Sequence, residues 1–353
     1  MHLMGEFDLI GRHFSRPPPA SARHIALGVG DDAALLRPAP GMTLAISCDM
    51  LVAGRHFFAD TDACGLGHKA LAVNLSDLAA TGARPLGCTL ALALPAADDA
   101  WLAAFSRDLL ALAQESGCPL IGGDTTRGPL NLCITVLGEV PHGQALLRSG
   151  AQAGDDVWIS GTLGGARLAL HALQGRAGLP DLPAPLLAAA RRRLERPTPR
   201  LALGLALRGI ATACMDLSDG LAGDLPHILA ASRRPDAPLA ATLNEAALLA
   251  LTAPWAAPGL NDEARLMLAL AGGDDYELLF TAPPGARAAV QAAARRAATA
   301  ITRAGQITCA TPQTPPLLLQ TPEGALRPLP ADVAGFDHFG GGESNQEMGQ
   351  EMG

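Results

Sequence analysis

The first half of the chain alternates short apolar runs with stretches of helical periodicity. Apolar runs bounded by Gly, Pro and polar residues predict strands at 41–48, 86–94, 118–122 and 131–139. Between the first two runs, Leu71, Leu75 and Leu78 form one apolar stripe, which predicts a helix over 65–81. Asn74 and Asp77 share a different face of that helix, because residues three apart are neighbours on a helix surface.

A second helix is predicted over 98–116, with Asp98 as its N-cap and Gly117 as its stop signal. Its inward positions are Trp101, Leu102, Phe105, Leu109 and Leu112. The first half is therefore expected to alternate β and α elements.

The second half opens with the strand 157–160, followed by the glycine-rich turn 161–165 that begins a helix. Further on, the pattern predicts helices at 218–232 and 286–304 and strands at 277–282 and within 306–319. The stretch 141–156 is polar, rich in Gly and without periodicity, and we place the domain junction there.

These patterns predict an α+β, two-domain fold. The expected domains are 1–145 and 150–340, each large enough for its own core. The repeated Gln-Glu-Met-Gly of residues 341–353 is low in complexity and predicts a disordered tail.

The net charge of −8 argues against nucleic acid or an anionic membrane as a partner. The seven cysteines are scattered and form no C-x-x-C pair, which disfavours a zinc ribbon or a disulfide framework. The N-terminus carries acids where a signal peptide needs cations, and no apolar run reaches membrane-spanning length. We therefore expect a cytoplasmic protein.

Aspartates beside glycines are the most informative feature of the chain. They occur in Gly30-Asp31-Asp32, Gly122-Gly123-Asp124, Asp216-Leu217-Ser218-Asp219-Gly220 and Gly272-Gly273-Asp274-Asp275, while Asp49 follows an apolar run and Asp77 lies on a predicted helix. If these carboxylates converge, their repulsion is relieved by Mg²⁺ ions whose coordination a polyphosphate completes. The pattern favours an ATP-dependent phosphoryl-transfer site.

Two common nucleotide-binding frameworks are absent from the sequence. Lys69 neither follows Gly nor precedes Ser or Thr, so there is no Walker A loop, and no H-R-D or D-F-G set occurs. Residues 28–33 imitate a dinucleotide-binding turn, but two aspartates there would repel a pyrophosphate unless a metal intervened.

Each of these residues alone has a simpler interpretation. The turn 161–165 needs only a flexible backbone, Asp219 or Ser218 would cap a helix, and Asp124 would occupy a turn. Asp77 and His56 would be ordinary surface residues in most proteins. It is the whole set that favours a site.

The sequence around these residues also resembles the thiamine-monophosphate kinase family, over residues 5 to 339. The matching segments are 6–10, 30–33, 49–57, 69–80, 122–125, 215–221, 272–278 and 335–339, in the family's order. The wider superfamily includes aminoimidazole ribonucleotide synthetase, selenophosphate synthetase and a hydrogenase-maturation protein. Its members share an α+β two-domain fold that dimerises through N-terminal sheets, with a C-terminal α/β domain.

The resemblance implies that ATP phosphorylates thiamine monophosphate to thiamine diphosphate by direct in-line transfer with several Mg²⁺ ions, in a homodimer. It assigns metal binding to Asp32, Asp49, Asp77, Asp124, Asp216 and Asp219. It assigns ATP contacts to Gly123, Asp124, Arg148 and Ser218, and thiamine contacts to His56, Asp274 and Phe336. The acceptor is a phosphate oxygen that is already largely ionised, so no acid or base residue is required.

Three positions depart from the family pattern. Ala53 stands where the family usually has Glu, Cys48 where Thr or Ser commonly precedes Asp49, and Ser106 where a Tyr often lies near the adenosine. Two alternatives to the kinase remain: a superfamily relative that acts on another acceptor, and a non-catalytic Mg-nucleotide-binding protein.

Overall fold

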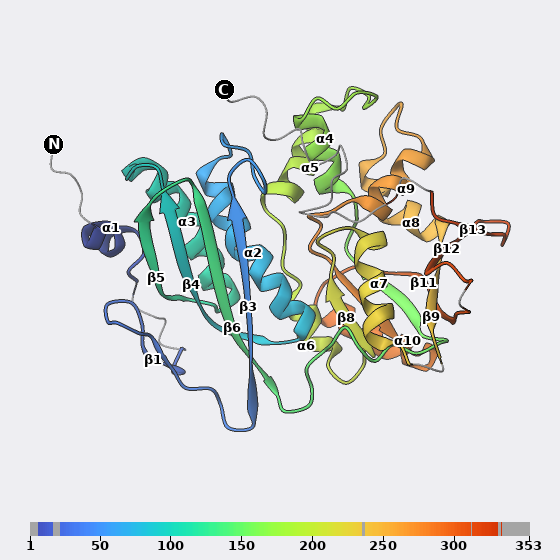
Figure 1. Ribbon diagram of the computed structural model, residues 1–353, viewed down its shortest axis with the longest axis horizontal. Coiled ribbons are helices and arrows are strands. Elements are labelled where there is room, and N and C mark those ends of the chain that lie inside the picture. Colours follow the sequence, from blue (N-terminus) through green and yellow to red (C-terminus); the bar gives the residue numbers. More distant parts are fainter. Residues whose placement is uncertain (1–5, 17–21, 235–236, 312, 331–332, 334–353) are drawn as a thin grey trace. The chain divides into compact units, whose positions relative to one another are not determined.

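The computed structural model describes residues 6–16, 22–234, 237–311, 313–330 and 333 (Figure 1). These residues form two compact units. The first comprises the described residues up to Leu78 together with Ala83–Gly143, and the second comprises Ala79–Gly82 and the described residues from Gln144 onward. A mixed α/β architecture with two units agrees with the predicted fold class.

The first unit is built on a four-stranded sheet of order β3-β6-β4-β5 (Figure 1). Its strands are β3 (Met42–Val52), β6 (Asn131–Pro141), β4 (Arg84–Leu94) and β5 (Leu120–Arg127). The β3–β6 and β6–β4 pairs are antiparallel, whereas β4 and β5 are parallel and are joined by a helix. The helix α1 (Glu6–His13) and the short antiparallel pair β1 (Ile25–Leu27) and β2 (Leu35–Leu36) precede the sheet.

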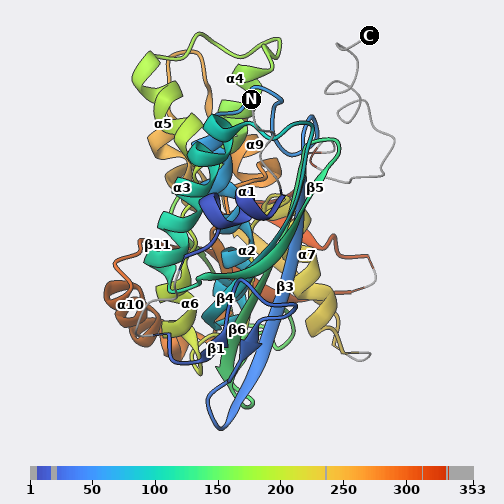
Figure 2. The same cartoon turned by 90° about the vertical axis from the view of Figure 1, so that its left-hand side faces the viewer.

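Helices α2 (Ala63–Thr81) and α3 (Asp99–Ser116) lie on the same face of this sheet (Figure 2). The predicted stripe of α2 is buried, with Leu71, Leu75 and Leu78 at most 1% exposed. Gly67 lets the helices touch, because a Cβ there would lie 2.1 Å from the carbonyl oxygen of Phe105. The two helices thereby supply the core of the first unit.

The ends of α3 are as the sequence predicts. The Asp98 side chain accepts hydrogen bonds from the backbone N–H groups of Ala100 and Trp101, at 2.9 and 3.1 Å. At the other end, Gly117 has a left-handed φ of 66° and its N–H returns to the last turn.

One face of β3 presents apolar side chains to solvent within its unit. Leu44, Ile46 and Met50 are 43%, 62% and 55% exposed. Since successive side chains of a strand alternate between faces, Ser47 and Asp49 project to the opposite face.

The second unit has a seven-stranded mixed sheet of order β13-β12-β9-β11-β7-β10-β8. Its strands are β7 (Asp156–Ser160), β8 (Ala213–Asp216), β9 (Leu239–Asn244), β10 (Leu278–Ala282), β11 (Ile301–Cys309), β12 (Leu317–Gln320) and β13 (Leu326–Pro328). All neighbouring pairs are antiparallel except β12 and β9.

Helices cover both faces of this sheet. Val157 and Ile159 of β7 pack in one cluster with α7 (Leu221–Ser232), α8 (Glu245–Leu251) and α9 (Asp262–Ala271). Trp158 points the other way, into a cluster with α6 (Leu201–Leu207) and α10 (Arg287–Arg296). This alternation is the period-2 pattern of a strand buried on both faces. A third cluster joins α4 (Gly165–Leu173) to α5 (Ala184–Glu195).

Most of the predicted elements are present, with shifted ends. The prediction of a single helix over 286–304 was wrong, because α10 ends at Arg296 and β11 begins at Ile301. The Ala- and Arg-rich composition has high helix propensity, but β11 pairs with β7 and β9, and these tertiary contacts override it. The predicted tail at 341–353 lies outside the described residues. Within the described part of the chain, no helix is long and apolar enough to cross a membrane.

Candidate active site

In the first unit, Asp49 and Asp77 lie near enough for their charges to interact. Asp49 projects from β3 and Asp77 from α2, and both side chains are partly buried. Burial, and then the negative charge of Asp77, raises the pKa of Asp49 to about 6. Two adjacent carboxylates that resist ionisation together offer hard oxygen donors, which fits a divalent cation such as Mg²⁺.

Neighbouring polar side chains fix this pair. The Ser47 hydroxyl donates to the Asp77 carboxylate, and the Asn74 side-chain oxygen accepts the backbone N–H of Asp49 at 2.9 Å. Asn74 in turn donates to the Ala70 carbonyl at 3.0 Å within α2. The expectation that Asn74 and Asp77 share a helix face is therefore confirmed, and that face meets β3.

Cys48 takes no part in this arrangement. Its side chain is exposed, and its sulfur lies 3.2 Å from the sulfur of Cys133 on β6. Because Ser47 precedes it on the other face, the hydroxyl next to Asp77 comes from position 47. Ser106, another of the three positions that depart from the family pattern, is buried in α3.

His56 lies in the turn after β3. Its ring Nδ1 accepts the backbone N–H of Val52 at 3.0 Å, so the other ring nitrogen carries the proton in the neutral form. The Lys69 ammonium, only 4% exposed, approaches the His56 carbonyl oxygen at 3.5 Å. The chain's single lysine thus packs against the segment that carries His56.

Gly123 and Asp124 lie inside the edge strand β5 rather than in a turn. Asp124 is exposed and pairs in register with Ala91 of β4. Gly123 is required by close packing, since a Cβ there would lie 1.9 Å from the Leu90 carbonyl oxygen, and its φ is 152°. Asp32, also exposed, donates its backbone N–H to the Asp31 carboxylate at 2.8 Å.

In the second unit, Asp216 ends β8 and is 6% exposed, and Ser218 and Asp219 follow in the turn before α7. The turn is held by Asp224, a residue that the sequence reasoning missed. Its carboxylate, 1% exposed, accepts the backbone N–H groups of Ser218 and Asp219, both at 3.0 Å. Burial raises the pKa of Asp224 to about 7.

Capping by Asp219 or Ser218, the simpler interpretation, does not occur at the start of α7. The N-cap is Gly220, with φ 91° and no side-chain cap. Arg148 belongs to the same region, because its charge acts on Asp224 and its carbonyl accepts the Ser232 hydroxyl at 3.3 Å.

Asp274 lies in a loop that contacts the turn after β8. Its backbone N–H donates to the Ser218 carbonyl at 2.9 Å, and its carboxylate accepts the Tyr276 hydroxyl at 3.0 Å. The second unit therefore brings together five of the predicted residues: Arg148, Asp216, Ser218, Asp219 and Asp274. Phe336 lies outside the described residues.

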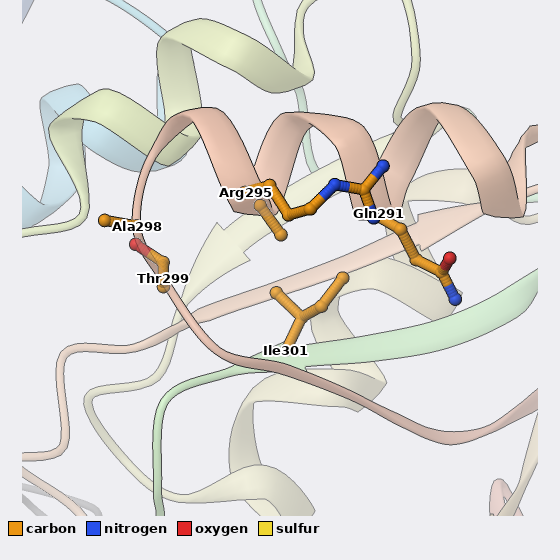
Figure 3. Close-up of a pocket in the computed structure, with 6 residues that line it drawn as sticks. Gln291, Arg295, Ala298, Thr299 and Ile301 are labelled. Atoms are coloured by element: carbon orange, nitrogen blue, oxygen red, sulfur yellow. The ribbon is translucent and has the colours of Figure 1, made fainter.

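Across the described ranges, no group of three His, Cys, Asp or Glu side chains lies close enough to hold a metal ion by itself. A shallow, open cavity of about 310 Å³ lies elsewhere, between α10 and β11 (Figure 3). It is lined by Gln291, Ala294, Arg295, Ala298, Thr299 and Ile301, and none of these is a predicted site residue.

Comparison with known proteins places this arrangement in a class. Residues 30–140, which carry Asp32, Asp49, Asp77 and Asp124, match the family described as AIR synthase related protein, N-terminal domain. The first unit is therefore a domain of the aminoimidazole ribonucleotide synthetase type.

Similar proteins of known name identify the family more closely. The chain is 44% identical to the thiamine-monophosphate kinase of Escherichia coli (strain K12) over 336 residues, 95% of this chain and 98% of that protein. It belongs to the thiamine-monophosphate kinase family, whose members are kinases that act on a phosphate group.

Two solved structures are similar as well. The crystal structure of thiamine-monophosphate kinase from Stenotrophomonas maltophilia K279a superposes with a TM-score of 0.74 at 44% identity, over 84% of this chain and 91% of that chain. The structure of AaThiL complexed with AMPPCP and TMP gives a TM-score of 0.67 at 25% identity, over 86% and 89% of the two chains.

Proposed function

We propose that this protein transfers the terminal phosphoryl group of ATP directly to thiamine monophosphate, giving ADP and thiamine diphosphate. The observation that carries the proposal is 44% identity to a thiamine-monophosphate kinase over nearly the whole chain. The relative complexed with AMPPCP and TMP supports the same pair of substrates.

We assign metal binding to Asp32, Asp49, Asp77, Asp124, Asp216 and Asp219. Bound Mg²⁺ would neutralise charge on the phosphates. The repulsion between the Asp49 and Asp77 carboxylates supports the assignment, because a bound cation would relieve that repulsion. We assign ATP contacts to Gly123, Asp124, Arg148 and Ser218.

The chain's own residues would act by positioning and by electrostatics. Asp224 holds the N–H groups of Ser218 and Asp219 inward, which fixes the turn that carries Asp219. The acceptor oxygen is ionised near neutral pH, so in-line transfer needs no base from the protein.

We assign thiamine binding to His56, Asp274 and Phe336. A carboxylate at position 274 would offset the permanent charge of the thiazolium ring, and an aromatic ring at 336 would stack on it. The protein would act as a homodimer, with the apolar face of β3 covered by a second copy.

An acceptor screen tests the proposal. Consumption of ATP would be measured with thiamine monophosphate, free thiamine, a formylglycinamidine nucleotide and selenide in parallel. Thiamine monophosphate alone should support steady turnover. Turnover with another acceptor would indicate a superfamily relative, and turnover with none would indicate a non-catalytic nucleotide-binding protein.

A further inference from the structure

The loop between α9 and β10 has an unusual backbone. Asp274 and Tyr276 have φ values of 63° and 50°, in the left-handed region that non-glycine residues rarely adopt. Such conformations persist where the surrounding structure holds them, and they concentrate at functional sites.

Two buried acids of the same loop hold it in place. Glu277, fully buried, accepts hydrogen bonds from the Ser160 hydroxyl at 2.5 Å, Arg193 at 2.8 Å and Arg200 at 2.5 and 2.6 Å. Asp275, 1% exposed, accepts the backbone N–H of Gly164 at 2.8 and 3.1 Å. Arg193 also donates to the Asp275 carbonyl at 3.0 Å, so one network fixes both residues.

The alternate residues of the loop, Asp274 and Tyr276, are only partly buried. The Tyr276 hydroxyl donates to Oδ1 of Asp274 at 3.0 Å, and the backbone N–H of Tyr276 donates to the Leu217 carbonyl at 2.8 Å. Both residues are thus tied to the 216–220 turn, which the proposed function assigns to metal and ATP.

The Arg167 guanidinium is a second group that interacts with the Asp274 carboxylate. Arg167 on α4 lies close enough for its charge to act on Asp274, and a Cβ at Gly272 would lie 3.4 Å from the Arg167 Cβ. If both carboxylate oxygens turned onto this guanidinium, the carboxylate would be neutralised within the protein. The Tyr276 hydroxyl opposes this by holding Oδ1.

We propose that Tyr276 is a positioning residue for the acceptor, because its hydroxyl holds the Asp274 carboxylate oriented toward a cationic heterocycle. A carboxylate whose orientation is fixed by a hydrogen bond attracts, along one direction, a ring that carries a permanent positive charge. This inference rests on the proposed function and adds a specificity-determining residue to it.

Kinetics of Tyr276→Phe, which removes only the hydroxyl, give the first test. We expect the KM for thiamine monophosphate to rise about tenfold, while kcat and the KM for ATP stay within about threefold of the wild type. In the Asp274→Asn background, the same change should have little further effect, because the two residues act as one unit.

Thr212→Val is the matched control. It deletes a hydroxyl that also donates to a carboxylate of the second unit, that of Asp155 at 2.7 Å. It should leave both KM values unchanged. If Thr212→Val raises the KM for thiamine monophosphate as much as Tyr276→Phe does, the cause is a general loss of order in the unit, and the proposal is wrong.

A spectroscopic test separates positioning from stability. Tyr276 is the chain's only tyrosine, so fluorotyrosine labels one site and gives one fluorine NMR resonance. The resonance should shift when thiamine monophosphate is added, and Asp274→Asn should shift it in the free protein. If the wild type is active but its resonance does not shift when thiamine monophosphate is added, the proposal is wrong. If the wild type does not phosphorylate thiamine monophosphate at all, the proposed function is wrong instead.

Discussion

At the residue scale, a short turn can hold an acidic side chain in place for the metal binding that we propose. Asp219 illustrates this, because its backbone N–H is held by Asp224 while its own carboxylate is left partly exposed. In this turn the buried Asp224 has a structural role, and the partly exposed Asp219 is the acid that we assign to metal binding.

Replacing Asp219 by Asn should therefore lower kcat/KM by about a hundredfold or more, since charge stabilisation of about 3 kcal/mol is lost. Raised Mg²⁺ should restore part of the activity if metal affinity is the defect. Asp262→Asn, which changes a surface acid paired with Arg265, is the control and should be neutral. Wild-type activity in Asp219→Asn at every Mg²⁺ concentration would refute the metal assignment.

Gly123 is the second test at this scale. Gly123→Ala places a Cβ against the Leu90 carbonyl, so we expect the free energy of unfolding to fall by more than about 2 kcal/mol. Gly122→Ala is the matched control, because a Cβ there would meet its nearest atom, on Thr89, at 3.8 Å. Urea unfolding of the two variants measures the difference, and equal stabilities would contradict the packing described.

The sequence singled out several of the acids that we assign to the site, because they stand next to glycines. It gave no reason to choose Asp224 or Tyr276. Asp224 reads as an ordinary acid in the first turn of a helix, and only the fold shows that it receives two N–H groups from the preceding turn. Tyr276 acquires its partner through a left-handed φ that no local pattern indicates.

At the element scale, the buried Glu277 of the α9–β10 loop links two helices and one strand. Glu277 receives Arg193 from α5 and Arg200 from the residue before α6, and Ser160 ends β7. Removing Arg193 takes one of two cations from the buried Glu277 and leaves the Asp275 carbonyl without its arginine donor.

Arg193→Met should lower the free energy of unfolding by about 3 kcal/mol or more. The control lies on the same helix: Arg191, with 48% of its side chain exposed, pairs with Glu195 at the surface. Arg191→Met should cost less than about 0.5 kcal/mol. Chemical denaturation compares the two, and similar losses would show that the buried network adds nothing.

Helices and strands with a clear apolar pattern were predictable, whereas the start of β11, which lies among helix-forming residues, was not. Helix α3 has its cap, stripe and stop signal in the sequence, and all three are present. Strand β11 starts within a segment rich in helix formers, and its conformation depends on β7 and β9, which are distant in the chain.

At the scale of the whole molecule, the exposed apolar face of β3 favours burial against a second copy of the chain. Ile46, 62% exposed at the centre of the strand, is its most exposed large side chain. Light scattering at micromolar concentration should find a dimer, and Ile46→Glu should shift it to monomer. Leu326→Glu, at a similarly exposed position on β13, should leave the dimer intact. An active wild-type monomer would contradict the proposed assembly.

The most direct measurement follows the phosphorus atoms of the reaction. With ATP, Mg²⁺ and thiamine monophosphate, phosphorus NMR should show ADP and thiamine diphosphate forming in equal amounts, with no inorganic phosphate. Free thiamine in place of the monophosphate should give no phosphorylated product, because its hydroxyl would need a base. Release of inorganic phosphate without thiamine diphosphate, or transfer to free thiamine, would contradict direct transfer to the acceptor phosphate.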